Sequence, residues 1–293
     1  MLSSPVTENL VDVIKSGLST VKTIDQKGRM YASSSAYCAR QTALNMTYTG
    51  KELVSASTQF YFGLGVAAEN IVVDGFRARK KLLYDSDEQY KLPDLGLNLG
   101  GKIDCIIEHN QKILGIEVKT CGKLPEKPQQ EHVAQATLYS AVLQIPFSIV
   151  YVSRNVNDYY GNLQIKEFMI DCSNFNHEQA LKTVVFGKFM AEAGYMPDIP
   201  AHITNDSDCG FCRFKSICWG SEQSHLDNLS KMDTSEFSEI AQLTNDKVKD
   251  ILSTSNRTYR YNGLITNLVY SGTPEARKLV ESVEFNKSLT SCF

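Results

Sequence analysis

Two carboxylates and a lysine are spaced so that they could share one site. Glu117 and Lys119 lie two residues apart in a stretch that alternates like a β-strand, so both side chains point to the same face. Asp104 precedes Glu117 with 12 residues between them, and a hairpin turning near Asn110 would bring the two carboxylates together. Such hard oxygen ligands suit Mg²⁺ or Mn²⁺ and the hydrolysis of phosphodiesters. Glu117 and Lys119 alone would also fit an exposed, salt-bridged strand face.

Three further polar side chains lie in segments with helical spacing. Gln135 and Tyr139 are four residues apart and share one helix face, which His132 joins three residues before Gln135. Glu69 lies in a separate helical stretch. Taken alone, each of these residues would be ordinary for a protein surface or core.

Three of the eight cysteines form a tight cluster in the sequence. Cys209, Cys212 and Cys218 have the spacing Cys-x2-Cys-x5-Cys, and three thiolates this close can ligate one soft metal centre. A fourth ligand would then come from elsewhere in the chain. Zinc and an iron-sulfur cluster both stay open, because spacing alone does not identify the metal.

Composition narrows the class of protein. The chain has 293 residues, of which 42% are hydrophobic and 22% charged, as in globular proteins with a sizeable core. No apolar run approaches the roughly 20 residues of a membrane span, and residues 1–20 lack the apolar segment of a secretory signal. The net charge of -3 gives no general attraction to nucleic acid, although a local basic groove with a divalent cation would still bind it. We therefore expect an intracellular protein whose cysteines are not paired in disulfides.

The segments that must position these residues alternate between helices and strands. A serine-capped helix is expected to begin at Ser33–Ser35 and to carry Cys38 in its first turns. A hairpin within 95–120 would hold Asp104 on its first strand. The other expected segments are helices over 58–80, 132–144 and 176–192, a returning hairpin strand over 112–119, a two-proline loop over 123–130, and strands over 147–153 and 164–171 joined through 158–161.

The hairpin segments carry a family resemblance. Residues 101–104, Gly-Lys-Ile-Asp, and 115–120, Gly-Ile-Glu-Val-Lys-Thr, resemble the core hairpin of RecB-like PD-(D/E)xK nucleases. The resemblance implies that Asp104, Glu117 and the Val118 carbonyl hold Mg²⁺ or Mn²⁺. It also implies that the lysine of the second segment orients the attacking water or stabilises charge on the phosphate.

Two other segments extend the resemblance. Gln135 and Tyr139 match the Gln-x-x-x-Tyr motif that follows the catalytic lysine in RecB-like nucleases, where it contacts DNA or supports the site. Gly65 is followed four residues later by Glu69, where the iron-sulfur class usually has histidine and YqaJ-type viral exonucleases, similar to the lambda exonuclease, have glutamate. The resemblance implies that Glu69 is a third carboxylate near the metal.

The cysteines resemble those of one branch of these enzymes. The segment from Ser34 to Arg40 is similar to the Ser-x-x-x-Cys-x-Arg helix start of Cas-four-type exonucleases and the AddB nuclease domain. In those families one amino-terminal and three carboxy-terminal cysteines hold a [4Fe-4S] cluster. The resemblance implies that the ligands here are Cys38, Cys209, Cys212 and Cys218, with Zn²⁺ as the alternative occupant.

These observations lead to a set of expectations. The fold is expected to be α/β and restriction-endonuclease-like, with a mixed central sheet flanked by helices and an iron-sulfur clasp. A helical lead-in over 1–32 would precede a nuclease domain over 33–220 and a mostly helical extension over 221–293, where Asp233 begins a capping box and Pro274 is a first helical residue.

The expected function is that of a divalent-metal-dependent DNA exonuclease acting on single strands or ends. The alternative is a non-catalytic nucleic-acid-binding subunit of a recombination or repair complex. Expected partners are DNA and a helicase, recombinase or other repair protein, in the cytoplasm of a bacterial or virus-infected cell.

Overall fold

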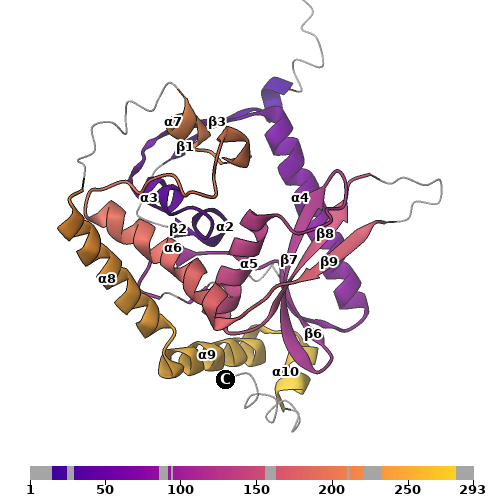
Figure 1. The fold of residues 1–293 in the computed structure, drawn as a ribbon. Helices are drawn as coiled ribbons and strands as arrows, with labels where there is room; N and C mark the ends of the chain where they lie inside the picture. The colour runs from indigo at the N-terminus through magenta and orange to yellow at the C-terminus, as the bar shows by residue number, and fades with distance from the viewer. Residues whose placement is uncertain are drawn as a thin grey trace, which may run out of the picture.

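Figure 1 shows the computed structural model of the chain, which describes residues 15–24, 30–85, 92–93, 95–155, 163–209, 212–220 and 232–281. The connection expected through 158–161 lies outside these residues, as do residues 1–14 and 25–29 of the helical lead-in expected over 1–32. In the described part of that lead-in, residues 15–18 are helical but β1 (Thr20–Ile24) is a strand, so the expectation is wrong there. In the described part, no helix is long and apolar enough to cross a lipid bilayer.

A five-stranded mixed sheet forms the centre of the fold, in the order β4-β6-β7-β8-β9. Neighbouring strands are antiparallel except β7 and β8, which are parallel because the chain between them crosses over through a helix. The expected α/β architecture with a mixed central sheet is confirmed. The strands are β4 (Leu82–Asp85), β6 (Cys105–His109), β7 (Lys112–Cys121), β8 (Phe147–Ser153) and β9 (Ile165–Met169).

Helices cover both faces of this sheet (Figure 1). Helix α4 (Ala56–Ala78) packs on one face, where its Ala68, Val72 and Val73 join the apolar side chains of β6, β7 and β8. Helices α5 (Gln130–Leu143) and α6 (Asn174–Glu192) cover the other face and contribute to the main core. Side chains from α4 and from α5 can therefore both reach the strand ends that lie between these two layers.

The hairpin of β6 and β7 is confirmed, but its first strand is shorter than expected. Asn110 and Gln111 form its turn with positive φ angles of 51° and 63°, the conformation that matches the twist of two-residue hairpins. The residues before Cys105 do not extend this strand. Instead, β5 (Leu99–Gly100) pairs with β2 (Met30–Tyr31) in a separate parallel ladder. Asp104 therefore lies just before β6.

The expected helix around Cys38 is wrong in one respect. The segment divides into α2 (Ala32–Ser35) and α3 (Ala39–Thr47), and Cys38 is the N-cap of α3. Its sulfur accepts a hydrogen bond from the backbone N–H of Gln41 at 3.4 Å. A thiol can replace serine in this role because it also accepts from a free N–H at the helix start.

The carboxy-terminal helices are part of the same core as the sheet. They are α8 (Thr234–Ile251), α9 (Thr254–Ser271) and α10 (Pro274–Glu281). The expected capping box at Asp233 and the first-position Pro274 are both confirmed. Val248, Leu264 and Leu268 join the main core, and α8 and α9 are longer than expected. Helix α8 packs on α6 and α9 on α5, whereas α10 packs against α9 and β4 (Figure 1).

Candidate active site

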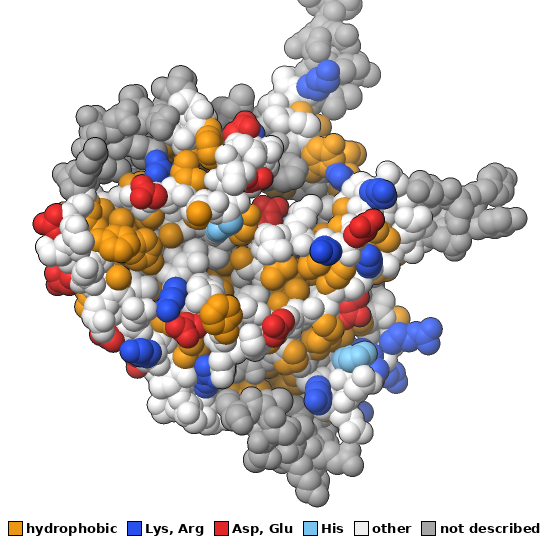
Figure 2. Space-filling view, viewed as in Figure 1, with side chains coloured by type: hydrophobic (Ala, Val, Ile, Leu, Met, Phe, Trp, Pro, Cys, Tyr) orange, Lys and Arg blue, Asp and Glu red, His pale blue; other side chains and the backbone are white. Residues whose placement is uncertain are grey.

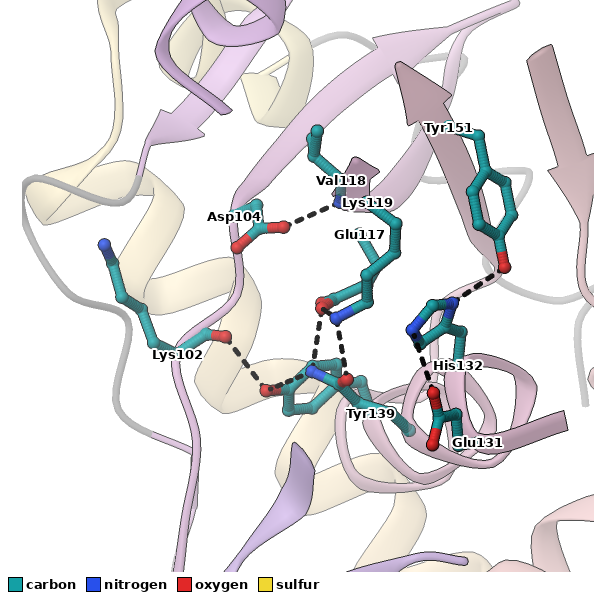
Figure 3. A network of polar contacts seen from close by, with 10 residues as sticks. Lys102, Asp104, Glu117, Val118, Lys119, Glu131, His132, Tyr139 and Tyr151 are labelled. Atoms are coloured by element: carbon teal, nitrogen blue, oxygen red, sulfur yellow. Dashed lines mark hydrogen bonds and ion pairs between the residues drawn. The ribbon is translucent and has the colours of Figure 1, made fainter. Parts of the chain in front are cut away.

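The hairpin brings the two predicted carboxylates together. Cys105 pairs with Ile116 in the antiparallel ladder, so Asp104, the residue before Cys105, lies opposite Glu117, the residue after Ile116. The backbone N–H of Val118 donates to Asp104 Oδ2 at 2.6 Å, which fixes that carboxylate against β7 (Figure 3). Glu117 is only 3% exposed. Glu117 is thus held within β7, and Asp104, just before β6, is tied to β7 by a backbone hydrogen bond.

Gln135 joins the acid and the lysine. Lys119 Nζ lies 2.7 Å from Glu117 Oε1 and donates to Gln135 Oε1 at 3.0 Å. Gln135 Nε2 in turn donates to Glu117 Oε1 at 2.8 Å. An amide can do this because it carries both an acceptor and donors. The Gln135 side chain therefore sets the relative position of the acid and the ammonium group.

Tyr139 anchors the approach to Asp104. Its hydroxyl donates to the Lys102 carbonyl at 2.9 Å and lies 3.3 Å from Gln135 Nε2 (Figure 3). A Cβ added at Gly101 would lie 2.8 Å from the Tyr139 ring. Glycine is needed there because the ring packs directly on the backbone that leads into Asp104.

Glu69 reaches the site from α4 at its edge. Its Oε1 lies 3.4 Å from Lys102 Nζ, and its charge raises the pKa of both Asp104 and Glu117. The structure thus brings all six predicted catalytic side chains into one neighbourhood. Among the described residues, however, no three His, Cys, Asp or Glu side chains are close enough to ligate one ion directly.

The electrostatics of the site favour a bound cation. Burial and the Glu117 and Glu69 charges raise the pKa of Asp104 well above its usual range, and burial also raises the pKa of Glu117. Burial lowers the pKa of Lys119, but the neighbouring carboxylates more than offset it, so the net shift is upward and the lysine stays charged. A divalent cation beside the two carboxyl groups would lower both pKa values and keep both groups ionised.

Glu117 also has an unsatisfied atom. Its Oε2 is buried and accepts no hydrogen bond from any described residue. A buried carboxylate oxygen without a partner is costly, and a divalent cation would satisfy it. The donor set of carboxylate oxygens therefore fits Mg²⁺ or Mn²⁺.

A second polar chain lies beside the lysine. His132 Nδ1 lies 2.7 Å from the Tyr151 hydroxyl, which also accepts from the Gln129 backbone N–H, and Glu131 lies 3.6 Å from His132 Nε2 (Figure 3). Burial and the charge of Lys119 lower the pKa of His132 to about 3, so its imidazole is neutral. The helical spacing from Gln135 indicated His132. Nothing in the sequence pattern indicated Glu131 or Tyr151.

The four predicted cysteine ligands gather in one region but do not form a metal site in the described residues. Cys38 caps α3, Cys209 ends the 3-10 helix η2 (Asp206–Cys209), and Cys218 lies in α7 (Lys215–Trp219). Burial and the three other thiols raise the pKa of Cys212 to about 12. Four neighbouring thiols are a donor set that fits a soft metal centre.

Comparison with known proteins agrees with this geometry. Two carboxylates and a lysine gathered at a β-hairpin of a mixed sheet suit the metal-assisted hydrolysis of phosphodiesters. The family model of the PD-(D/E)XK nuclease superfamily matches residues 36–219, and the chain belongs to this superfamily. It is therefore a nuclease.

Two other comparisons add less. No curated protein matches the chain. The solved structure described as "Crystal structure of SSO0001" is similar over 66% of this chain and 87% of that one, with 17% sequence identity and a TM-score of 0.39.

Proposed function

We propose that the protein is a Mg²⁺- or Mn²⁺-dependent exonuclease that hydrolyses phosphodiester bonds in single-stranded DNA or at DNA ends. The observation that carries the proposal is the single network in which Asp104, Glu117, Lys119 and Gln135 are held, with a buried, unsatisfied oxygen on Glu117. The membership of the chain in a nuclease superfamily supports DNA as the substrate class.

Each side chain has a distinct proposed role. Asp104, Glu117 and the Val118 carbonyl would hold the cation, and Glu69 would supply a third carboxylate from the edge of the site. The cation would lower the pKa of the attacking water and offset charge on the phosphate. Lys119 would donate to that water or to a phosphate oxygen, because its pKa is raised and its proton retained.

Gln135 and Tyr139 are positioning residues in this scheme. Gln135 keeps the ammonium group beside Glu117, and Tyr139 holds the segment that leads into Asp104 through the Lys102 carbonyl. Neither needs to touch the phosphate to matter, because a small displacement of the acid or the lysine would lower the rate steeply.

We also propose that Cys38, Cys209, Cys212 and Cys218 hold a structural [4Fe-4S] cluster of the RecB-like type, with Zn²⁺ as the competing occupant. The grouping of the four thiols supports this assignment. Such a cluster would join η2 and α7 to α3, far apart in the sequence. Anaerobic purification with iron, sulfide and zinc analysis separates the two occupants.

The test of hydrolysis compares purified protein with Asp104→Ala and Lys119→Ala on single-stranded DNA labelled at either end, with Mg²⁺ or Mn²⁺. We expect cleavage by the wild type but not by Asp104→Ala or Lys119→Ala, and resistance of circular single strands to the wild type. Lys112→Ala is the matched control. Because Lys112 is exposed at the opposite end of β7, this variant should cleave DNA like the wild type. Equal cleavage by all four proteins would overturn the proposal. DNA binding without cleavage by the wild type would favour a binding subunit.

The cellular setting follows only from resemblance. A helicase, recombinase or other repair protein as partner, and a bacterial or virus-infected cytoplasm as location, remain proposals. Co-purification from the native host with the catalytically inactive Asp104→Ala variant would test them.

A further inference from the structure

The amino-terminal half of α4 exposes three consecutive aromatic side chains. Phe60, Tyr61 and Phe62 are 59%, 44% and 52% exposed, although the other end of the same helix is buried against the sheet. Figure 2 shows apolar side chains gathered over the upper end of α4, beside lysine or arginine side chains. Phe60 and Tyr61 contact each other edge to face, with ring centroids 6.1 Å apart, and an exposed aromatic patch marks a binding surface more often than an isolated exposed residue does.

Arg154, the residue that follows β8, lies over one ring of this patch. The Arg154 guanidinium carbon lies 4.6 Å from the centre of the Tyr61 ring, a cation-π distance. The backbone N–H of Arg154 donates to the Cys121 carbonyl at 2.8 Å. Because Cys121 follows Lys119 by two residues on β7, the ring and its arginine lie at the strand end that carries the catalytic lysine.

Only Phe62 of the three aromatic residues lies on the α4 face that leads to the active site, because Tyr61 and Phe60 lie about 100° and about 200° away from it around the helix. Phe62 and Val66 precede Glu69 by seven and three residues, so all three lie on one helix face. At a rise of about 1.5 Å per residue, Phe62 lies roughly 10 Å from Glu69 along the axis. A Cβ added at Gly65 would meet no atom within 4 Å, so the surface between them is open.

We propose that Phe60, Tyr61 and Arg154 form a base-stacking platform that binds single-stranded DNA and directs it to the carboxylates. Aromatic rings bind any base through its π-face, and an arginine beside them binds the phosphates and stacks on bases. The overall charge of -3 provides no general attraction to DNA, so stacking would supply affinity that net charge does not. The part of this proposal that directs the DNA strand to the carboxylates rests on the proposed hydrolysis of DNA there.

Duplex DNA and a protein partner are less consistent with these observations. Bases in a duplex are already stacked on each other, so exposed rings would add little binding free energy by stacking on them. A protein surface would cover the rings without needing the fixed guanidinium beside the catalytic strand. The platform therefore selects unpaired nucleotides.

The test measures binding of fluorescein-labelled oligo-dT by anisotropy with Ca²⁺ in place of Mg²⁺, so that cleavage does not interfere. A second strand with the same phosphates but abasic sugars serves as the comparison. For Tyr61→Ala and for the double variant Phe60→Ala/Tyr61→Ala, we expect the Kd for oligo-dT to rise on the order of tenfold per ring. Binding of the abasic strand should stay close to that of the wild type, and Tyr61→Trp should restore oligo-dT binding.

Tyr270→Ala is the matched control, because Tyr270 is 77% exposed on α9 and should leave both affinities unchanged. Unchanged oligo-dT binding by the double variant would overturn the platform and leave the rings to a protein partner. An equal loss on both strands would overturn it as well, since it would indicate a phosphate or folding effect.

The platform and the proposed hydrolysis fail separately. Ring-dependent binding by a wild type that does not cleave DNA would support the platform and overturn the hydrolysis. Metal-dependent cleavage together with ring-independent binding would do the reverse.

Discussion

The carboxylate site and the cysteine cluster are both built from residues far apart in the sequence, but they are supported differently. Asp104, Glu117 and Lys119 are fixed by a strand register and by hydrogen bonds from Val118 and Gln135. The cysteines come from a helix cap, a 3-10 helix, a connecting segment and a five-residue helix. Around them lies only a small apolar cluster in the described residues, formed by Leu44, Phe214, Ile217 and their neighbours.

This difference indicates what each region needs from its metal. Long strands and α5 keep the carboxylates in place without an ion, so the ion serves catalysis. The short cysteine-bearing segments bury little apolar surface, so a ligand that joins four thiols would supply much of their stability. We therefore expect that loss of the proposed active-site cation would mainly lower activity, whereas loss of the proposed metal at the cysteines would mainly lower stability.

Glu117→Gln should give the largest effect and confine it to activity. The substitution keeps the shape and an oxygen for Gln135 but removes the charge that holds the cation. We expect cleavage to fall at least about 1,000-fold, equivalent to about 4 kcal/mol. Removal of the charge relieves the cost of burying Glu117 but also takes away the ion-pair partner of Lys119, so the melting temperature should change little compared with the activity. Turnover and thermal melting measure the two quantities.

Iron content is the control for that variant. It should equal that of the wild type, because the cysteines do not depend on Glu117. A large fall in melting temperature together with activity would contradict the contrast between the two regions.

Cys212→Ala should act on stability first. Removing one of four proposed ligands should abolish iron binding and lower the free energy of unfolding by several kcal/mol, the scale of a structural metal. Activity should fall only as far as folded protein is lost. Cys172→Ala is the matched control, because that cysteine lies outside the cluster and its thiol donates to the Ile170 carbonyl. Unchanged iron and stability in Cys212→Ala would contradict the assignment.

The parts of the molecule that were predictable from sequence are those governed by local pattern. The hairpin follows from alternation around Asn110, where the two strands must turn back on each other. The capping box at Asp233 likewise depends on residues within one helical turn. Side chains that act at a fixed spacing within one segment can therefore be predicted from the sequence alone.

Contacts between distant segments were not predictable. Arg260 is buried and donates to the carbonyls of Val142, Ile251 and Ala141, which ties α9 to the end of the helix that carries Gln135. No spacing indicates such a contact. The capping role of Cys38 was missed for a related reason, because the break after Ser35 depends on packing rather than on helix propensity.

The smallest expected effect concerns the support beneath the active-site helix. His177 on α6 lies 3.0 Å from the Ser140 hydroxyl on α5, and its Nδ1 is buried without a hydrogen-bond partner in the described residues. Burial and the charges of Arg257 and Arg260 lower the pKa of His177 from 6.5 to about 4. The folded state therefore prefers neutral histidine, whereas the unfolded chain takes up a proton near pH 6.5.

His177 should thus stabilise the protein fully above pH 6.5, and this contribution should be lost as the pH falls from 6.5 through about 4. The loss amounts to at most about 3 kcal/mol. Urea unfolding of the wild type and of His177→Gln, at neutral and acidic pH, isolates it, because glutamine can bond Ser140 but does not titrate. We expect the free energy of unfolding of His177→Gln to fall less between neutral and acidic pH than that of the wild type, by that amount. Equal pH dependence in both proteins would show that acid acts elsewhere, and α5 would then owe its stability to contacts such as Arg260 rather than to a neutral His177.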